Sequence, residues 1–138
     1  MLDETTEFGA HAARRLREEI IGWLTTVTPD GAPQPVPVWF LWDGADSILL
    51  YSRPGKRKLR NIAANPKVSL NLDSDRVDAD IVVCWGEIRV TDDPPVAQVP
   101  DYIAKYAERI AALGWTPESF AADFSVPLRI SLSRVHGW

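Results

Sequence analysis

The segment Tyr51-Ser-Arg-Pro-Gly-Lys-Arg-Lys-Leu-Arg-Asn61 joins a predicted strand to a predicted helix. It places five basic residues within eight positions, a third of the 15 lysines and arginines in the chain. The apolar run 48–51 before it predicts a strand, and Leu59, Ile62 and Ala63 recur at the i, i+3, i+4 spacing of a helix. Pro66 should end that helix, because a proline disfavours helical geometry in the residue before it.

The basic residues crowd the first turn of this helix, where free backbone N–H groups and the helix dipole are already positive. Lys56, Arg57 and Lys58 can therefore converge on one anion, above all a phosphate. A solvated basic turn on the surface is the alternative interpretation, and a charge run alone does not separate the two. The helical spacing predicts that Leu59, Ile62 and Ala63 face the protein and that Arg57 and Asn61 point outward.

Composition indicates one globular domain spanning residues 1–138, with 46% apolar and 25% charged residues. The net charge of −4 argues against nucleic acid as a partner. The single cysteine, Cys84, excludes an internal disulfide and suits a reducing compartment. The N-terminus is acidic, and no apolar run approaches the ~20 residues of a membrane span. We therefore expect a cytoplasmic protein.

The chain reads as a mainly β domain with peripheral helices. Helices are predicted at 5–17, from the basic segment to about 65, at 100–113 and at 117–124. Strands are predicted at 20–28, 32–42, 47–52, 67–73, 81–91 and 127–135. Six short strands joined by hairpin turns predict an antiparallel barrel rather than a parallel α/β sheet. Gly86, inside a strand, predicts a bulge or a barrel bend.

Three prolines alternate along the second strand, at Pro33, Pro35 and Pro37. Since proline lacks a backbone N–H, one edge of this strand loses three donors in a row and cannot form a normal ladder. Two interpretations remain open: an edge strand protected against aggregation, or a strand that borders a ligand.

No residue pattern predicts a catalytic or metal site. His11 and His136 lie far apart without zinc-ligand neighbours, and Cys84 sits mid-strand as an inert core thiol. The acidic segment 73–80 could hold a metal, but a solvated loop is the favoured interpretation. Nucleophile-elbow, Walker and Gly-x-Gly-x-x-Gly patterns are missing from the sequence. An anion site without an acid–base set indicates that a bound cofactor carries the chemistry. The six tryptophans could line a flat pocket or fill a core.

The order and spacing of several motifs resemble the pyridoxamine 5′-phosphate oxidase-like split β-barrel superfamily, and within it the F420 (deazaflavin)-dependent oxidoreductases of the B group. The matching segments are Thr25 to Phe40, Tyr51-Ser52, Lys58-x-Arg60-Asn61-Ile62, Asn65-Pro-Lys-Val-Ser69 and Ser133-Arg-Val-His-Gly-Trp138. This resemblance implies a six-stranded antiparallel split β-barrel of the FMN-binding type. It also implies a homodimer with a flavin-like cofactor in each of two grooves between the subunits.

The resemblance also assigns site residues. Cofactor contacts are implied for Pro35, Val36, Pro37, Val38, Ser52, Lys56, Arg57, Lys58 and Asn61. In this set the three basic residues and Ser52 match phosphate-binding positions, and the strand residues 35–38 match the backbone along the deazaflavin ring. The FMN-binding oxidases carry an Arg and a Lys on the second strand, where this chain has Val36 and Trp39, so F420 is favoured over FMN. His136 resembles the histidine of a terminal Arg-x-His motif, and either a structural role or a substrate contact is open to it.

The implied activity is hydride transfer from reduced F420 to an unidentified electron-poor small molecule. The alternatives are an FMN-dependent oxidase or reductase and a non-catalytic F420 or flavin carrier.

Overall fold

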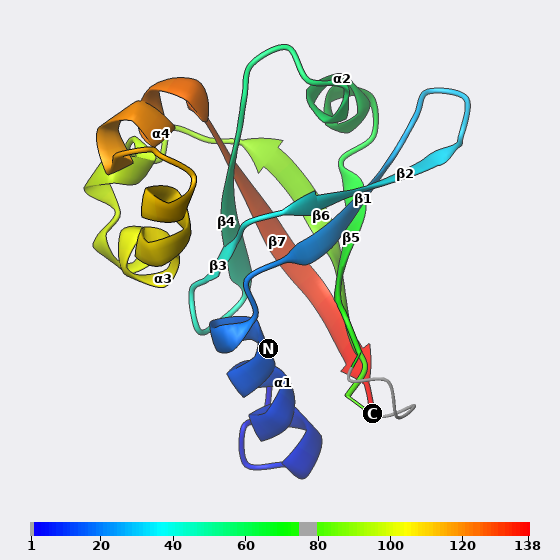
Figure 1. Cartoon of the computed structure of the whole chain (residues 1–138). Helices are drawn as coiled ribbons and strands as arrows, with labels where there is room; N and C mark the ends of the chain where they lie inside the picture. Colours follow the sequence, from blue (N-terminus) through cyan, green and yellow to red (C-terminus); the bar gives the residue numbers. More distant parts are fainter. Residues whose placement is uncertain (1, 75–79) are drawn as a thin grey trace.

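The computed structural model describes residues 2–74 and 80–138, which form a curled antiparallel sheet with helices around it (Figure 1). The strands are β1 (Gly22–Val27), β2 (Pro33–Val38), β3 (Leu41–Trp42), β4 (Ser47–Ser52), β5 (Lys67–Leu72), β6 (Val82–Val90) and β7 (Val126–Gly137). The helices are α1 (Glu7–Glu18), α2 (Arg57–Ala64), α3 (Pro100–Ala112) and α4 (Pro117–Asp123), with a 3-10 turn, η1, at Val96–Gln98. The middle of the predicted acidic loop, 75–79, lies outside the described residues. None of the described helices is long and apolar enough to cross a bilayer.

The connection between β2 and β3 explains why the sheet curls. The strand order is β2-β1-β5-β6-β7-β4-β3, so these two strands occupy opposite edges. Yet β2 ends at Val38 and β3 begins only three residues later, at Leu41. The chain between these two residues can span at most about 11 Å. The two edges must therefore approach each other, and the sheet closes into a half-open barrel. The expected mainly β split barrel is confirmed.

The described sheet has seven strands where six were predicted, because the predicted strand 32–42 is interrupted at Phe40. The Phe40 N–H donates to Tyr106 Oη at 2.8 Å, and its carbonyl accepts from Lys105 Nζ at 3.0 Å. Both partners belong to α3. These bonds turn the Phe40 backbone away from strand pairing, so β2 pairs with β1 and the short β3 pairs with β4.

Strand β2 lies at an edge of the sheet, a position that agrees with both interpretations of its prolines. Pro33, Pro35 and Pro37 stand opposite Val27, Thr25 and Trp23 of β1. Because a proline cannot donate to its neighbour, these must be the pairs that do not exchange hydrogen bonds. The proline backbones then face the free edge, which carries carbonyl oxygens without N–H donors at these three positions.

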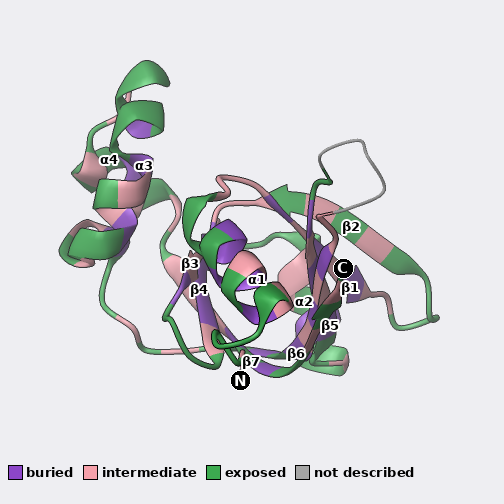
Figure 2. Cartoon of the chain, turned by 90° about the horizontal axis from the view of Figure 1, so that it is seen from below, coloured by how far each residue is buried: buried purple, intermediate pink, exposed green. Residues whose placement is uncertain are grey.

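Two hydrophobic cores lie on the two faces of β4. Inside the barrel, Ile48 and Leu50 pack with α1, whose Ala12 and Leu16 are completely buried. Figure 2 shows α1 against the open end of the barrel. On the other face, Leu49 and Tyr51 pack under α3 and α4. Because side chains alternate between the two faces of a strand, β4 contributes residues to both cores.

Gly86 marks a register shift between β6 and β7, which confirms the predicted bulge. A Cβ atom at this position would lie 2.2 Å from the Ser131 carbonyl oxygen, so a side chain does not fit there.

Candidate functional site

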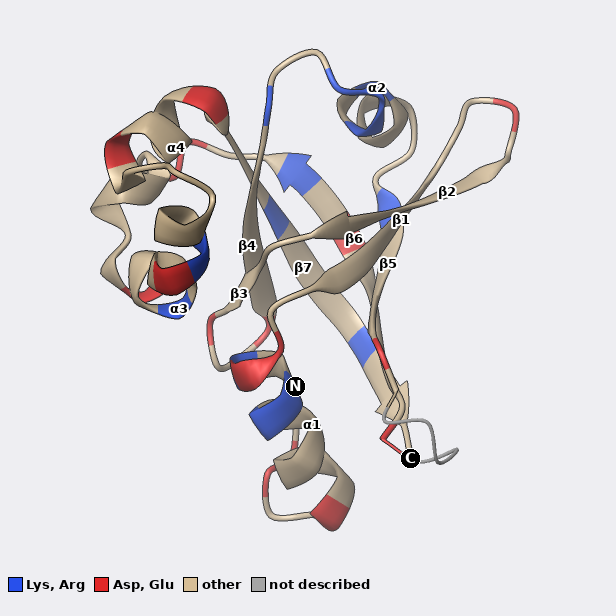
Figure 3. Ribbon diagram, in the orientation of Figure 1, with Lys and Arg blue, Asp and Glu red and all other residues tan. Residues whose placement is uncertain are grey.

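A cationic hollow lies between the start of α2 and the edge strand β2. It has a volume of about 470 Å³ and is lined by Lys56, Arg57, Lys58, Thr26, Pro33, Gln34, Pro35 and Val36. Helix α2 has no side-chain cap at its N-terminus and no acidic residue in its first turn. Figure 3 shows the lysines and arginines gathered at this helix start. The free N–H groups at the helix start, the positive end of the helix dipole and three cationic side chains therefore all point to the same hollow and favour an anion there.

The orientation of α2 agrees with the prediction for Leu59 and Ile62, which pack on the barrel core, and differs from it for Asn61 and Ala63. Asn61 is 2% exposed and faces the sheet, whereas Ala63 is exposed. The Asn61 side-chain amide donates to Thr26 Oγ1 at 3.0 Å and to Gln34 Oε1 at 2.8 Å. These polar partners on β1 and β2 rotate the helix so that Lys58, Asn61 and Ile62, also spaced i, i+3, i+4, lie on its inner face. Asn61 thereby holds α2 over β1 and β2.

Lys58 is half-buried, and both burial and the neighbouring charge of Lys56 lower its pKa. Within residues 2–74 and 80–138, Lys56, Arg57 and Lys58 form no ion pair with a carboxylate. A partly desolvated positive charge is costly unless an opposite charge lies near it. The donor set thus fits an anionic group such as a phosphate, which would supply the missing countercharge.

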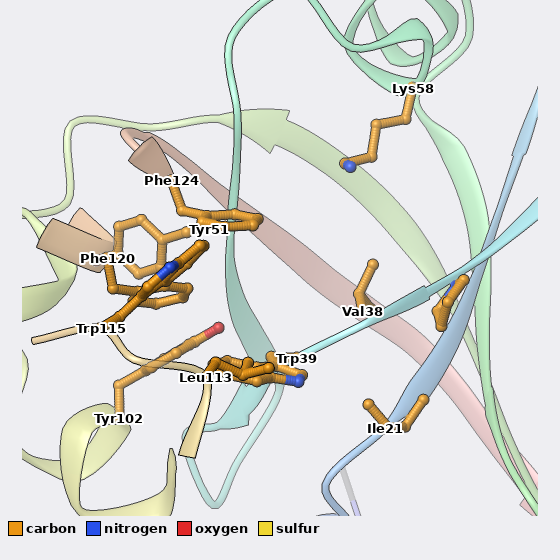
Figure 4. A pocket seen from close by; sticks show the side chains of 11 residues that line it. Ile21, Val38, Trp39, Tyr51, Lys58, Tyr102, Leu113, Trp115, Phe120 and Phe124 are labelled. Carbon is orange, nitrogen blue, oxygen red and sulfur yellow. The ribbon is translucent and has the colours of Figure 1, made fainter. Parts of the chain in front are cut away.

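A second pocket of about 270 Å³ adjoins Lys58 on its other side (Figure 4). Its wall is aromatic and consists of Trp39, Tyr51, Tyr102, Trp115, Phe120 and Phe124. The rings hold one another in place: Trp39 stacks on Tyr106 with centroids 4.5 Å apart, and Phe120 lies 4.8 Å from Phe124. Figure 4 shows the Lys58 ammonium group directed toward this wall. The aromatic pocket can therefore hold a flat apolar ligand next to the cationic hollow.

Arg53 fastens the aromatic wall to the basic loop. Its guanidinium group pairs with Asp123 at 2.8 Å and lies 4.8 Å above the Phe124 ring. Asp123 ends α4, and Arg53 follows β4 directly, so this contact links the aromatic side of the site to the basic loop.

The structure brings most of the predicted site residues together. Pro35 and Val36 line the cationic hollow, Pro37 and Val38 line the aromatic pocket, and Lys58 lines both. Ser52 is completely buried, and its hydroxyl donates to the Arg53 carbonyl at 2.8 Å. His136 lies on β7 beside Trp85, with ring centroids 6.5 Å apart, and lines neither cavity.

Other groups considered from the sequence give no site. No cluster of three or more possible metal ligands occurs among the described residues. Burial raises the pKa of the Cys84 thiol to about 12, so it stays protonated and unreactive at neutral pH, as predicted. The sequence pattern did not predict the aromatic wall as part of a site. Tyr102 and Phe120 have the helical spacing of ordinary core residues, so nothing in the pattern distinguishes them from the core.

A half-open antiparallel barrel with a basic helix start beside its edge strand defines a split β-barrel protein. The chain belongs to the pyridoxamine 5′-phosphate oxidase family, whose N-terminal-region model matches residues 8–138. Among solved structures it is similar to an F420 reductase, with 26% identity and a TM-score of 0.68 over 89% of this chain and 94% of that one.

Two further structures show the same fold. The general stress protein 26 of Bacillus anthracis has 15% identity and a TM-score of 0.71 over 95% of this chain and 93% of its own. An FAD-binding protein of Mesorhizobium loti has 19% identity and a TM-score of 0.64 over 91% and 90%. None of the functionally curated proteins matches this sequence.

Proposed function

We propose that the protein is an F420-dependent oxidoreductase that passes a hydride from reduced F420 to an electron-poor small molecule. The observation that carries this proposal is the position of Lys58, which lines both the cationic hollow and the aromatic pocket. A phosphate-bearing cofactor with a flat ring needs these two environments side by side. The similarity to an F420 reductase supports the choice of cofactor class.

The residues of the site fit such a cofactor. Lys56, Arg57 and Lys58 would hold the phosphate, and the backbone of 35–38, which lacks N–H donors at Pro35 and Pro37, would lie along the ring. When bound, the cofactor supplies the hydride. The aromatic wall excludes water and orients the acceptor. Asn61 acts indirectly, since it holds α2 in place. A substrate contact for His136 would require a partner subunit, because this residue lines neither cavity of its own chain.

We expect F420 to bind more tightly than FMN. Strand β2 carries no cation that could replace the Arg and Lys of the FMN-binding oxidases, while three cations line a roomy hollow that suits a phosphate with an anionic tail. Trp39 and Trp115 line the adjoining pocket, so quenching of tryptophan fluorescence during parallel titrations with the two cofactors measures both affinities. Equal or tighter binding of FMN would contradict the proposal. Oxidation of reduced F420 only when an acceptor is added would separate an enzyme from a carrier.

We further propose a homodimer. Trp138 at the end of β7 and Val90 at the end of β6 are 63% and 55% exposed, and burial of such apolar surface favours association with a second copy. Light scattering at micromolar concentration should give twice the mass of the chain. A monomer under these conditions would contradict both the dimer and a groove shared between two subunits.

A further inference from the structure

Lys105, on α3, carries an amine that the proposed function does not use. The side chain is half-buried, and its Nζ donates to the Phe40 carbonyl at 3.0 Å and lies 3.9 Å from the centre of the Phe40 ring. Figure 1 shows α3 beside the connection between β2 and β3, which contains Phe40. Among residues 2–74 and 80–138, no carboxylate forms an ion pair with this amine. The amine is therefore held by a carbonyl oxygen and an aromatic face, neither of which carries a full negative charge.

These surroundings favour the neutral form of the amine. Burial lowers the pKa of Lys105 to about 8, although the nearby carboxylate of Glu19 acts in the opposite direction. At about pH 7.5 roughly a quarter of such amines are neutral, against about one in a thousand for a lysine with the ordinary pKa of about 10.4. A neutral amine has a free electron pair and is a nucleophile. Because Lys105 is not sealed from solvent, a small electrophile can reach it.

A second cation lies close to this amine. Arg109 follows one turn later on the same side of α3, is exposed, and pairs with no carboxylate of the described chain. Its charge acts on the hydroxyl group of Tyr106, whose oxygen lies 3.1 Å from the same Phe40 carbonyl oxygen that Lys105 contacts. A small molecule that reaches Lys105 therefore meets a positive charge that can hold an anionic group.

We propose that Lys105 is a modification site that accepts an acyl group from small acyl phosphates, with Arg109 holding the phosphate. The neutral amine attacks the acyl carbon, a C–N bond forms, and the bond from this carbon to the phosphate oxygen breaks. The phosphate leaves with the electron pair of that bond, and the surplus proton on the nitrogen passes to water. The product is an uncharged amide, so the positive charge above the Phe40 ring is lost. This modification is independent of the proposed cofactor.

The test treats the folded protein with acetyl phosphate at about pH 7.5 and follows each lysine by quantitative peptide mass spectrometry. Lys67, which is exposed on β5, is the internal reference. Lys105 should react at least about 10-fold faster than Lys67, because far more of its amine is neutral. Its rate should level off above about pH 8, where most of the amine has already lost its proton. In concentrated urea the two lysines should react at similar rates, since the advantage of Lys105 depends on the fold.

Arg109→Gln tests the phosphate contact. It should slow acetylation of Lys105 by acetyl phosphate about 1.5- to 5-fold, the effect of one exposed charge pair. Its reaction with N-hydroxysuccinimidyl acetate, an uncharged acyl donor, should stay the same. Arg60→Gln, which removes the same charge from an exposed position on α2, should change neither rate. The proposal is overturned if Lys105 reacts no faster than Lys67 in the folded protein, if its advantage persists in urea, or if Arg109→Gln reacts with acetyl phosphate as fast as Arg60→Gln does.

Discussion

Replacement of Lys58 by alanine is expected to weaken F420 binding by about 10- to 150-fold, the value of one charge-assisted hydrogen bond. Lys58 is the residue that lines both cavities, and within the described chain no carboxylate neutralises it. The fold should tolerate the change, because burial and Lys56 lower the pKa of Lys58 and its charge therefore does not favour folding. The melting temperature should stay the same or rise slightly.

Arg60→Ala is the matched control for this experiment. Arg60 lies on the same helix, carries the same charge and is exposed, and it lines neither cavity. It should leave the affinity nearly unchanged. Added salt should weaken F420 binding by the wild type more than by Lys58→Ala, since the variant has one cation fewer to be screened. Equal affinities of the two variants would mean that the basic helix start is a solvated surface.

Local signals predicted the elements of this fold well. Thr116-Pro117 marks the start of α4, where the Thr116 side chain accepts from the Ser119 N–H at 3.1 Å. Gly86 marks the bulge, and the alternating prolines mark the edge strand. In each case the residue type restricts the backbone at its own position, so the sequence carries the information without knowledge of the neighbours.

The features that were not predicted depend on contacts distant in the sequence. Strand β2 ends before Phe40 because Tyr106, on a helix far along the chain, takes the Phe40 N–H as a partner. In helix α2, Asn61 points inward because it donates hydrogen bonds to one polar side chain on β1 and one on β2. The hydrophobic spacing alone had predicted Ala63 on this inner face.

The second large effect is expected for Arg15→Met in α1. Arg15 is 7% exposed, and its guanidinium group bonds to the Asp80 carboxylate at 2.6 Å and to Glu19 at 2.9 Å. It also donates to the carbonyls of Asp73 and Asp80, which lie near the two ends of the connection between β5 and β6. One side chain thus fastens α1 to both ends of that connection. Its loss leaves a poorly solvated carboxylate and two carbonyls without their donor, so the free energy of unfolding should fall by about 3–5 kcal/mol.

The pH dependence of this loss distinguishes the ion pair from simple packing. Burial would raise the pKa of Asp80, but hydrogen bonds and charges from Arg15 and His11 outweigh it and lower the pKa below 3.8. A carboxylate with a lowered pKa stabilises the fold above its unfolded value, and this stabilisation disappears as the pH falls through the folded value. Urea unfolding should therefore show a large difference between wild type and Arg15→Met near neutral pH and a smaller one at about pH 3. Glu18→Met, at an exposed position of the same helix, should change the free energy of unfolding by less than about 0.5 kcal/mol at both pH values. A difference for Arg15→Met that does not shrink in acid would show that the aliphatic part of the side chain, rather than its charge, holds α1 against the barrel.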